Sequence, residues 1–332
     1  MRWWSVCWLV LVAGFHPETS IAAPQAGSFT YAVVVTGLDG DPEYGKLIQA
    51  WSKDLYSLLK RDGIAQDRLF WLAANRQEGV YAESRREQIT QLLGNLATRI
   101  RPQDGFQLFL IGHGSYDGYD YRFHIPGSDL TASQWNEMLG RIRAERQIIV
   151  NMTSSSGASL TPWRQKGRVV ITSTTSGRER NFSVFPRYFT EALQNPASDA
   201  DKNQAISVLE AFQYASREVT RYYESLKRLA TEHALLEDVG EGEGVREPNP
   251  NNGQGLLASA TILRHLGDSA AVETPDTREL RAKRRQLEEA IEQLKYRKAS
   301  MNTAVYQQQL EKLLLDLARI QQRLDEMEET QN

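Results

Sequence analysis

Cysteine is almost absent from this chain. Among its 332 residues only Cys7 is a cysteine, and it lies in an apolar run near the beginning of the sequence. If that run is removed during maturation, the mature chain has no thiol. Disulfide bonds, zinc sites built on thiolates and catalysis by a cysteine nucleophile are then all excluded.

An excess of charge of one sign is also absent. The chain has 39 basic and 42 acidic residues, with a formal net charge of −3 and no long basic block. This balance gives no electrostatic argument for nucleic acid, so we expect no nucleic-acid partner. With 41% hydrophobic residues, the chain is long enough for one sizeable domain and an accessory element.

The apolar run at residues 3–15 is too short for a comfortable membrane span. Arg2 precedes it, and the small residues Ala22 and Ala23 precede a suitable cleavage position near Pro24. We therefore expect residues 1–23 to be a secretory signal peptide. The mature protein is then secreted, with the periplasm as its expected location, and has no membrane span. An uncleaved anchor is the alternative.

Strands and helices alternate through residues 24–266, which we expect to form an α/β domain. Apolar, β-branched runs predict strands at 29–37, 68–73, 106–112, 147–152 and 168–176. Amphipathic spacing predicts helices at 43–61, 83–100, 130–142 and 185–193. This alternation predicts a mostly parallel sheet with helices on both faces. Ligands of such sheets bind beyond the carboxyl ends of the strands.

The second half of the chain is predicted to be more helical. We expect a long amphipathic helix at 203–236, a Gly/Pro-rich loop at 237–255 and a linker at 267–276. Residues 277–331 are charged, with leucines at spacings of three and four, which predicts coiled-coil helices. Their phase breaks near residues 300–304, so we favour an antiparallel hairpin over one continuous helix. Its apolar seam would pack on itself, on a second copy or on a partner.

Two of the predicted strands end in residues that suit catalysis. His113 follows a fully apolar strand and precedes Gly114 in "LFLIGHGS". A histidine there could act as a general acid or base, and a glycine lets its backbone N–H approach a substrate oxygen. The strand at 147–152 runs into "TSSSG", where a hydroxyl could serve as a nucleophile.

Taken together, these two motifs resemble the legumain family of peptidases and the wider caspase-like fold. That family has a strand ending in His-Gly and a later strand ending in Ala-Cys-x-Ser-Gly. Here Ser156 and Gly157 match the final Ser-Gly, so Ser154 stands at the cysteine position. The family's orienting asparagine, in a Gly-x-Asn-Gly setting after the first strand, corresponds to Asp39 in "GLDG".

The resemblance covers roughly residues 29–193 by fold pattern. The stretch at residues 185–215 also resembles bacterial secreted members of the family. It implies a caspase-like three-layer sandwich, to which the C-terminal coiled-coil hairpin is an addition. It also implies a legumain-like peptidase with serine in place of the nucleophilic cysteine, whose hydrolysis is either serine-based or lost. No cofactor is required for such chemistry.

For the active form, we expect Ser154 as nucleophile, His113 as acid and base, and Asp39 as the group that orients the histidine. The N–H groups of Gly114 and Ser154 would hold the oxyanion. Thr153 is a weaker candidate nucleophile. The alternative is a pseudoenzyme that binds peptides or proteins and assembles through its coiled coil. A simpler alternative for residues 154–156 is that these serines only cap the following short helix.

A phosphate-binding loop, and with it nucleotide hydrolysis, is a weaker alternative. The stretch "GDPEYGKL" at residues 40–47 fits G-x-x-x-x-G-K, but Leu47 replaces the serine or threonine that would bind magnesium. Asp41 and Glu43 would also place carboxylates where phosphates should lie. We expect an ordinary turn from strand to helix here, with Lys46 on a solvated helix face.

The stretch "DADKNQAISVLE" at residues 199–210 resembles a twelve-residue calcium loop. Gln204 departs from the pattern, because it replaces the glycine that makes the sharp turn. The alternative is a polar turn whose aspartates cap a helix. Calcium is therefore the candidate cofactor, and the expected ligands are Asp199, Asp201, Asn203, Ala205, Ser207 and Glu210.

Overall fold

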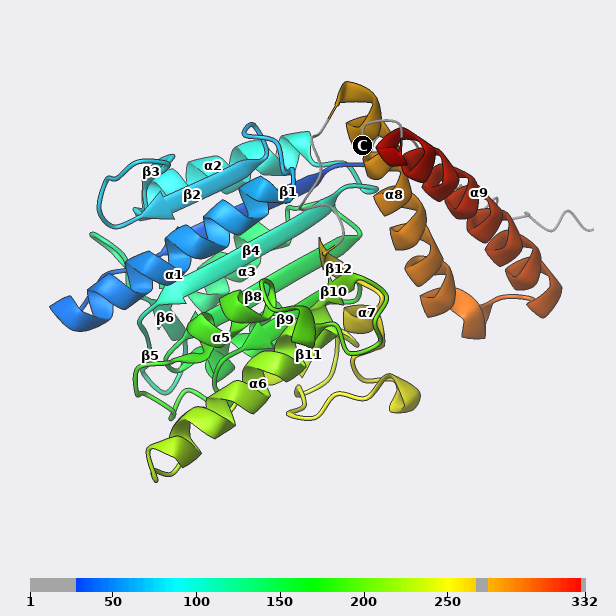
Figure 1. The fold of residues 1–332 in the computed structure, drawn as a ribbon. Helices are drawn as coiled ribbons and strands as arrows, with labels where there is room; N and C mark the ends of the chain where they lie inside the picture. Colours follow the sequence, from blue (N-terminus) through cyan, green and yellow to red (C-terminus); the bar gives the residue numbers. More distant parts are fainter. Residues whose placement is uncertain (1–27, 267–273, 330–332) are drawn as a thin grey trace, which may run out of the picture.

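The computed structural model describes residues 28–266 and 274–329. Its centre is a seven-stranded sheet in the order β11-β9-β8-β4-β1-β2-β3 (Figure 1). The strands are β1 (Thr30–Thr36), β2 (Leu69–Ala73), β3 (Ala82–Glu83), β4 (Gly105–Gly112), β8 (Arg146–Thr153), β9 (Arg168–Thr172) and β11 (Leu235–Glu237). All neighbouring pairs are parallel except β11 and β9. The predicted α/β class with a mostly parallel sheet is confirmed.

Helices cover both faces of this sheet. Alternate residues of β1 enter different apolar clusters, since Val34 packs on one face and Val35 on the other. Continuous apolar strands are expected where both faces are buried. The first face carries α1 (Pro42–Arg61), α5 (Phe185–Ala192) and α6 (Val208–Ser225). The second face carries α2 (Arg86–Arg99), α3 (Ala132–Leu139) and α4 (Leu160–Trp163).

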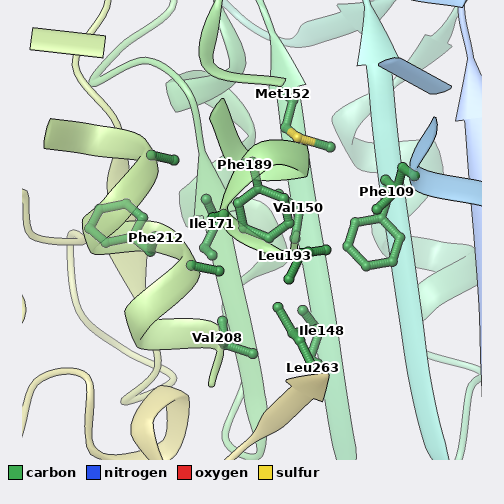
Figure 2. Close-up of a cluster of buried hydrophobic side chains, with 14 of the residues drawn as sticks. Phe109, Ile148, Val150, Met152, Ile171, Phe189, Leu193, Val208, Phe212 and Leu263 are labelled. Carbon is green, nitrogen blue, oxygen red and sulfur yellow. The ribbon is translucent and has the colours of Figure 1, made fainter. Parts of the chain in front are cut away.

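The core on the first face lies between α5, α6 and the strands β4, β8 and β9 (Figure 2). Phe189 of α5 and Phe212 of α6 point toward Val150 and Ile171 of the sheet. Both phenylalanine side chains are fully buried. Burying a side chain of this size contributes about 1.5–3 kcal/mol of transfer free energy. The packing of α5 and α6 therefore fixes the strands whose ends carry the candidate site.

Two small sheets lie outside the central one. β5 (Gly114–Tyr116), β6 (Tyr121–Phe123) and β7 (Leu130–Thr131) follow β4 directly, and they form antiparallel pairs. β10 (Ala205–Ser207) pairs with β12 (Ile262–His265), which follows the short helix α7 (Leu256–Ser259). The 3₁₀ turns are η1 (Ser156–Ser159), η2 (Pro196–Ser198), η3 (Pro250–Asn252) and η4 (Lys298–Ser300).

The long helix predicted at 203–236 is wrong at both ends. Helix α6 begins after Ser207, whose side chain forms a capping box with Glu210. It ends at Ser225, and Leu235 and Leu236 then pair with β9 as strand β11. These two leucines enter the two opposite apolar clusters, as neighbours in a strand do. Burial on both faces of the sheet therefore overrides the helical spacing of this segment.

The C-terminal helices α8 (Pro275–Arg297) and α9 (Thr303–Glu329) pack against each other side by side (Figure 1). Thr274 caps α8, and Pro275 occupies its first turn. Ile291, Leu294 and Leu324 are buried. Helix α8 also contacts the α/β domain, because Glu288 Oε2 lies 2.9 Å from His265 Nδ1. Most of the predicted linker at 267–276 lies outside the described residues.

No helix in residues 28–266 or 274–329 has the length and apolar character needed to cross a membrane. The predicted signal peptide at residues 1–23 lies outside the described residues.

Candidate active site

The sheet register brings the two strand-end motifs together. Strands β4 and β8 run parallel with Gly112 opposite Thr153, so His113 and Ser154 follow at the same edge. Strand β1 lies on the other side of β4 and ends at Thr36, shortly before Asp39. The loops after β1, β4 and β8 therefore converge beyond the carboxyl ends of the sheet, as expected for a ligand site.

The Ser154 hydroxyl is bonded twice to the same residue. It donates to the carbonyl of Gly114 at 2.9 Å and accepts from the Gly114 N–H at 3.1 Å. Ser154 is only 3% exposed. A serine hydroxyl has one proton, and here that proton goes to a backbone carbonyl. In this geometry His113 does not receive it, and the expected oxyanion donor of Gly114 is already bonded.

His113 contacts backbone and aromatic rings. Its Nε2 lies 3.3 Å from the carbonyl oxygen of Asp39. Because a carbonyl only accepts, Nε2 carries the proton, and Nδ1, which has no hydrogen bond to any described residue, is the acceptor of the neutral ring. The ring also lies close to Tyr44 and Phe182, which stack on each other with centroids 4.1 Å apart. Burial lowers the pKa of His113, and the contact with Asp39 opposes this only partly.

The carboxylate of Asp39 does not make the expected contact with His113. Its Oδ1 accepts from Gln49 Nε2 and its Oδ2 accepts from Asn75 Nδ2, both at 2.9 Å. The side chain is held against helix α1, where a Cβ at Gly45 would be 2.7 Å from Asp39 Cβ. Asp39 therefore contacts the histidine through its backbone, and its charge faces the other side of the loop.

The other serines of the motif have structural contacts. Ser155 has a φ of 58°, and its hydroxyl is buried without a hydrogen-bond partner in the part of the chain that the structure describes. The Ser156 hydroxyl lies within 3.2 Å of the hydroxyls of Ser173 and Thr174. Ser155 precedes η1 but makes no side-chain cap to it. The alternative that these serines cap the following short helix is therefore wrong at η1, its first turn, because the Ser155 side chain makes no capping hydrogen bond.

The weaker candidate Thr153 is also fully buried. Its Oγ1 lies 2.6 Å from the Tyr121 hydroxyl and 2.8 Å from Asn151 Oδ1. Burial raises the pKa of Tyr121, so this phenol stays neutral. The Tyr121 ring explains why residue 114 is a glycine, because a Cβ at this position would be only 2.4 Å from the edge of the ring. These contacts pack the loop and leave Thr153 no access to a substrate.

Sequence reasoning missed a carboxylate–histidine pair beside the serine loop. Glu179 Oε1 lies 2.6 Å from His233 Nδ1, and its Oε2 accepts the N–H groups of Thr175 and His233. The Glu179 carbonyl accepts the N–H of Ser155 at 2.8 Å. Glu179 and His233 are distant in the chain and belong to no common motif, so no pattern in the sequence pairs them.

The predicted calcium loop gathers its acidic side chains. Carboxylate oxygens of Asp199, Asp201 and Glu210 lie within 4.8 Å of one another. Gln204, at the position of the missing glycine, has a φ of 64°, the left-handed conformation that the turn needs. Burial, followed by the charges of Glu210 and Asp199, raises the pKa of Asp201. A divalent cation would relieve that repulsion.

The three other expected ligands are placed differently. Asn203 Oδ1 accepts from the Ala205 N–H, and the Ser207 hydroxyl donates to Glu210 Oε2. Ala205 lies in β10, opposite His265. The residues therefore fit a calcium loop in its acidic half, and calcium binding stays a prediction.

The segment at residues 40–47 leads into α1, which begins at Pro42. Asp41 caps the helix by accepting the Glu43 N–H at 2.8 Å, and Pro42 occupies the first turn. Lys46 is exposed on the helix surface. The geometry is that of the ordinary strand-to-helix turn expected above.

Comparison of the chain with protein-family models and with curated proteins gives no match. The functional argument therefore rests on the geometry of the site.

Proposed function

We propose that this chain is a non-hydrolytic relative of the legumain-like, caspase-fold peptidases that binds peptide segments beside His113. The observation that carries the proposal is the Ser154 hydroxyl, whose only proton goes to the Gly114 carbonyl. A nucleophilic serine needs a base that takes this proton. The second observation is that the Asp39 carboxylate faces Gln49 and Asn75, so no Ser-His-Asp set is assembled.

The family part of the proposal rests on the two motifs and on their placement. The segments that resemble the family's histidine and nucleophile loops follow adjacent parallel strands. Helices on both faces of the sheet are compatible with a caspase-like three-layer sandwich. A chain that keeps these two loops but cannot transfer the Ser154 proton to His113 would still retain the site at which a peptide binds. Secretion into the periplasm belongs to the same proposal.

The surroundings of His113 suit the recognition of a peptide. The free Nδ1 of the neutral ring accepts a hydrogen bond, such as one from a peptide N–H. Tyr44 is 42% exposed although it stacks on Phe182, so this aromatic pair is open to an apolar side chain. Aromatic surfaces beside a few fixed polar groups are typical of binding sites.

Two measurements test this proposal. A fluorophosphonate probe, which labels activated serines, should leave Ser154 unmodified in the wild-type chain. Labelling that Ser154→Ala abolishes would show serine-based hydrolysis and overturn the proposal. In parallel, the wild-type chain, carrying a fluorescent dye for detection, should bind some members of an array of random twelve-residue peptides. These peptides, the hits, should also bind saturably in solution.

The matched variants locate this binding. Tyr44→Ala removes half of the aromatic pair and should weaken binding of the hits about tenfold. Tyr119→Ala removes a tyrosine that is 96% exposed on the loop between β5 and β6, and should leave binding unchanged. Equal binding by both variants would place the peptide elsewhere. Ser154→Cys tests the framework, because gained amidase activity would show that only the thiol is missing.

A further inference from the structure

A hollow lies beside the loop whose Asp39 carbonyl contacts His113. It has a volume of about 580 Å³ and is open to solvent. Its lining is formed by Asp39, Gly40, Pro42, Gly45, Lys46 and Gln49. Gly40, one of the lining residues, lies against the histidine, since a Cβ at this position would be 2.8 Å from His113 Nε2. A ligand beside His113 could therefore extend into this hollow.

The only acidic group in the lining is the half-buried carboxylate of Asp39. Both of its oxygens accept from side-chain amides, which carry no charge. The amide of Gln49 is itself fixed, because its Oε1 accepts from Gln77 Nε2 at 2.6 Å. Among the described residues, no basic side chain forms an ion pair with Asp39. The carboxylate is thus held in place, but its charge is not neutralised.

Such a carboxylate still has capacity for a charged donor. An ionised carboxylate offers about four lone-pair positions, and the two amides use two of them. A guanidinium can donate two parallel N–H bonds to the remaining positions. The carboxylate already has its orientation before a ligand arrives, so binding requires little reorganisation.

Lys46 is the one group in the lining that opposes a cation. It is exposed on α1, and its ammonium lies on a flexible stem that can stay in water. It forms no ion pair with Asp39 among the described residues. Its charge should therefore weaken the binding of a cation without filling the position beside the carboxylate.

We propose that this hollow is a subsite for a basic side chain, above all arginine, of a peptide bound beside His113. This inference rests on the proposed peptide binding and names the residue that the peptide carries. The Asp39 backbone contacts the histidine and its side chain contacts the basic residue, so one residue joins the two parts of the site.

The experiment compares two end-blocked pentapeptides, Ala-Ala-Arg-Ala-Ala and the same sequence with citrulline, the neutral isostere of arginine. Binding to the full chain is followed by NMR shifts of the Gly40 and Gly45 amides. The arginine peptide should bind about tenfold more tightly, the ratio expected for a hydrogen-bonded charge. Asp39→Asn should abolish this preference. Asp41→Asn, which removes the same charge two residues away and keeps a helix cap, should preserve it.

Lys46→Met supplies an independent arm, because it removes the opposing charge and should increase the preference for arginine. Equal affinity of both peptides for the wild type and for Lys46→Met would overturn the cation subsite and leave peptide binding standing. Absence of binding by either peptide would overturn this inference together with the binding function proposed at His113.

Discussion

At the scale of single residues, the direction of one hydroxyl decides how the site works. The adjacency of His113 and Ser154 could be predicted, because residues that follow neighbouring parallel strands meet at one edge. The rotamer of Ser154 and the side to which the Asp39 carboxylate turns could not. Both depend on contacts that no motif encodes, with the Gly114 backbone and with the amides of Gln49 and Asn75.

Ser154→Ala should destabilise the fold by about 1–3 kcal/mol. It leaves the Gly114 N–H and carbonyl without the hydroxyl that both now contact, and buried polar groups without partners cost free energy. Ser155→Ala is the matched control, because that hydroxyl is also buried but has no hydrogen-bond partner among residues 28–266 and 274–329. Urea unfolding of both variants measures the difference. A larger loss for Ser155→Ala would contradict these contacts.

At the scale of elements, the strands and helices with one clear period were predictable and the exceptions came from tertiary contacts. The predicted strand at 106–112 corresponds to β4, and the helix at 185–193 corresponds to α5. The end of α6 was not predictable, because the leucines at 235 and 236 fit a helical period as well as a strand. Only pairing with β9 selects the strand.

Calcium should stabilise the loop at residues 199–210. At a concentration of 100 times the Kd, the melting temperature should rise by roughly 5 °C and return on addition of a chelator. Asp201→Asn removes an exposed ligand and should abolish the rise. Gln204→Gly supplies the residue that suits a φ of 64° and should tighten calcium binding. A melting temperature that neither calcium nor the chelator changes would contradict calcium binding.

Asp62 should make the stability depend on pH. This residue follows α1, and burial raises its pKa from 3.8 to about 6, although Arg264 opposes the shift. Between these two values the folded state binds more protons than the unfolded state, so stability falls as pH rises. Relative to Asp62→Asn, the wild type should lose up to about 3 kcal/mol between pH 4 and 7. Parallel pH profiles of the two chains would contradict this.

At the scale of the whole molecule, alternation of strands and helices predicted the class of the sheet but not its edges. The edge strand on one side is β11, which is antiparallel to β9, and the edge strand on the other side is β3, which has only two residues. Such short edge strands limit unwanted pairing with other chains. The two C-terminal helices pack on each other and add a separate surface outside this sheet.

Association through the C-terminal helices stays a prediction, and α9 offers the residues that test it. Leu314 and Leu315 are 48% and 51% exposed on this helix. If a second copy packs there, Leu314→Glu with Leu315→Glu should shift the chain to a monomer, because burying two carboxylates is unfavourable. Analytical ultracentrifugation measures this. An unchanged mass for the double variant would exclude this face as the interface.

The contacts of Glu179 have a consequence for motion. Its carbonyl holds the Ser155 amide, and its carboxylate holds the amides of Thr175 and His233. A ligand that displaces the serine loop must therefore stretch hydrogen bonds in two segments that it does not touch. Amide hydrogen exchange at Thr175 and His233 would then report an event at Ser155.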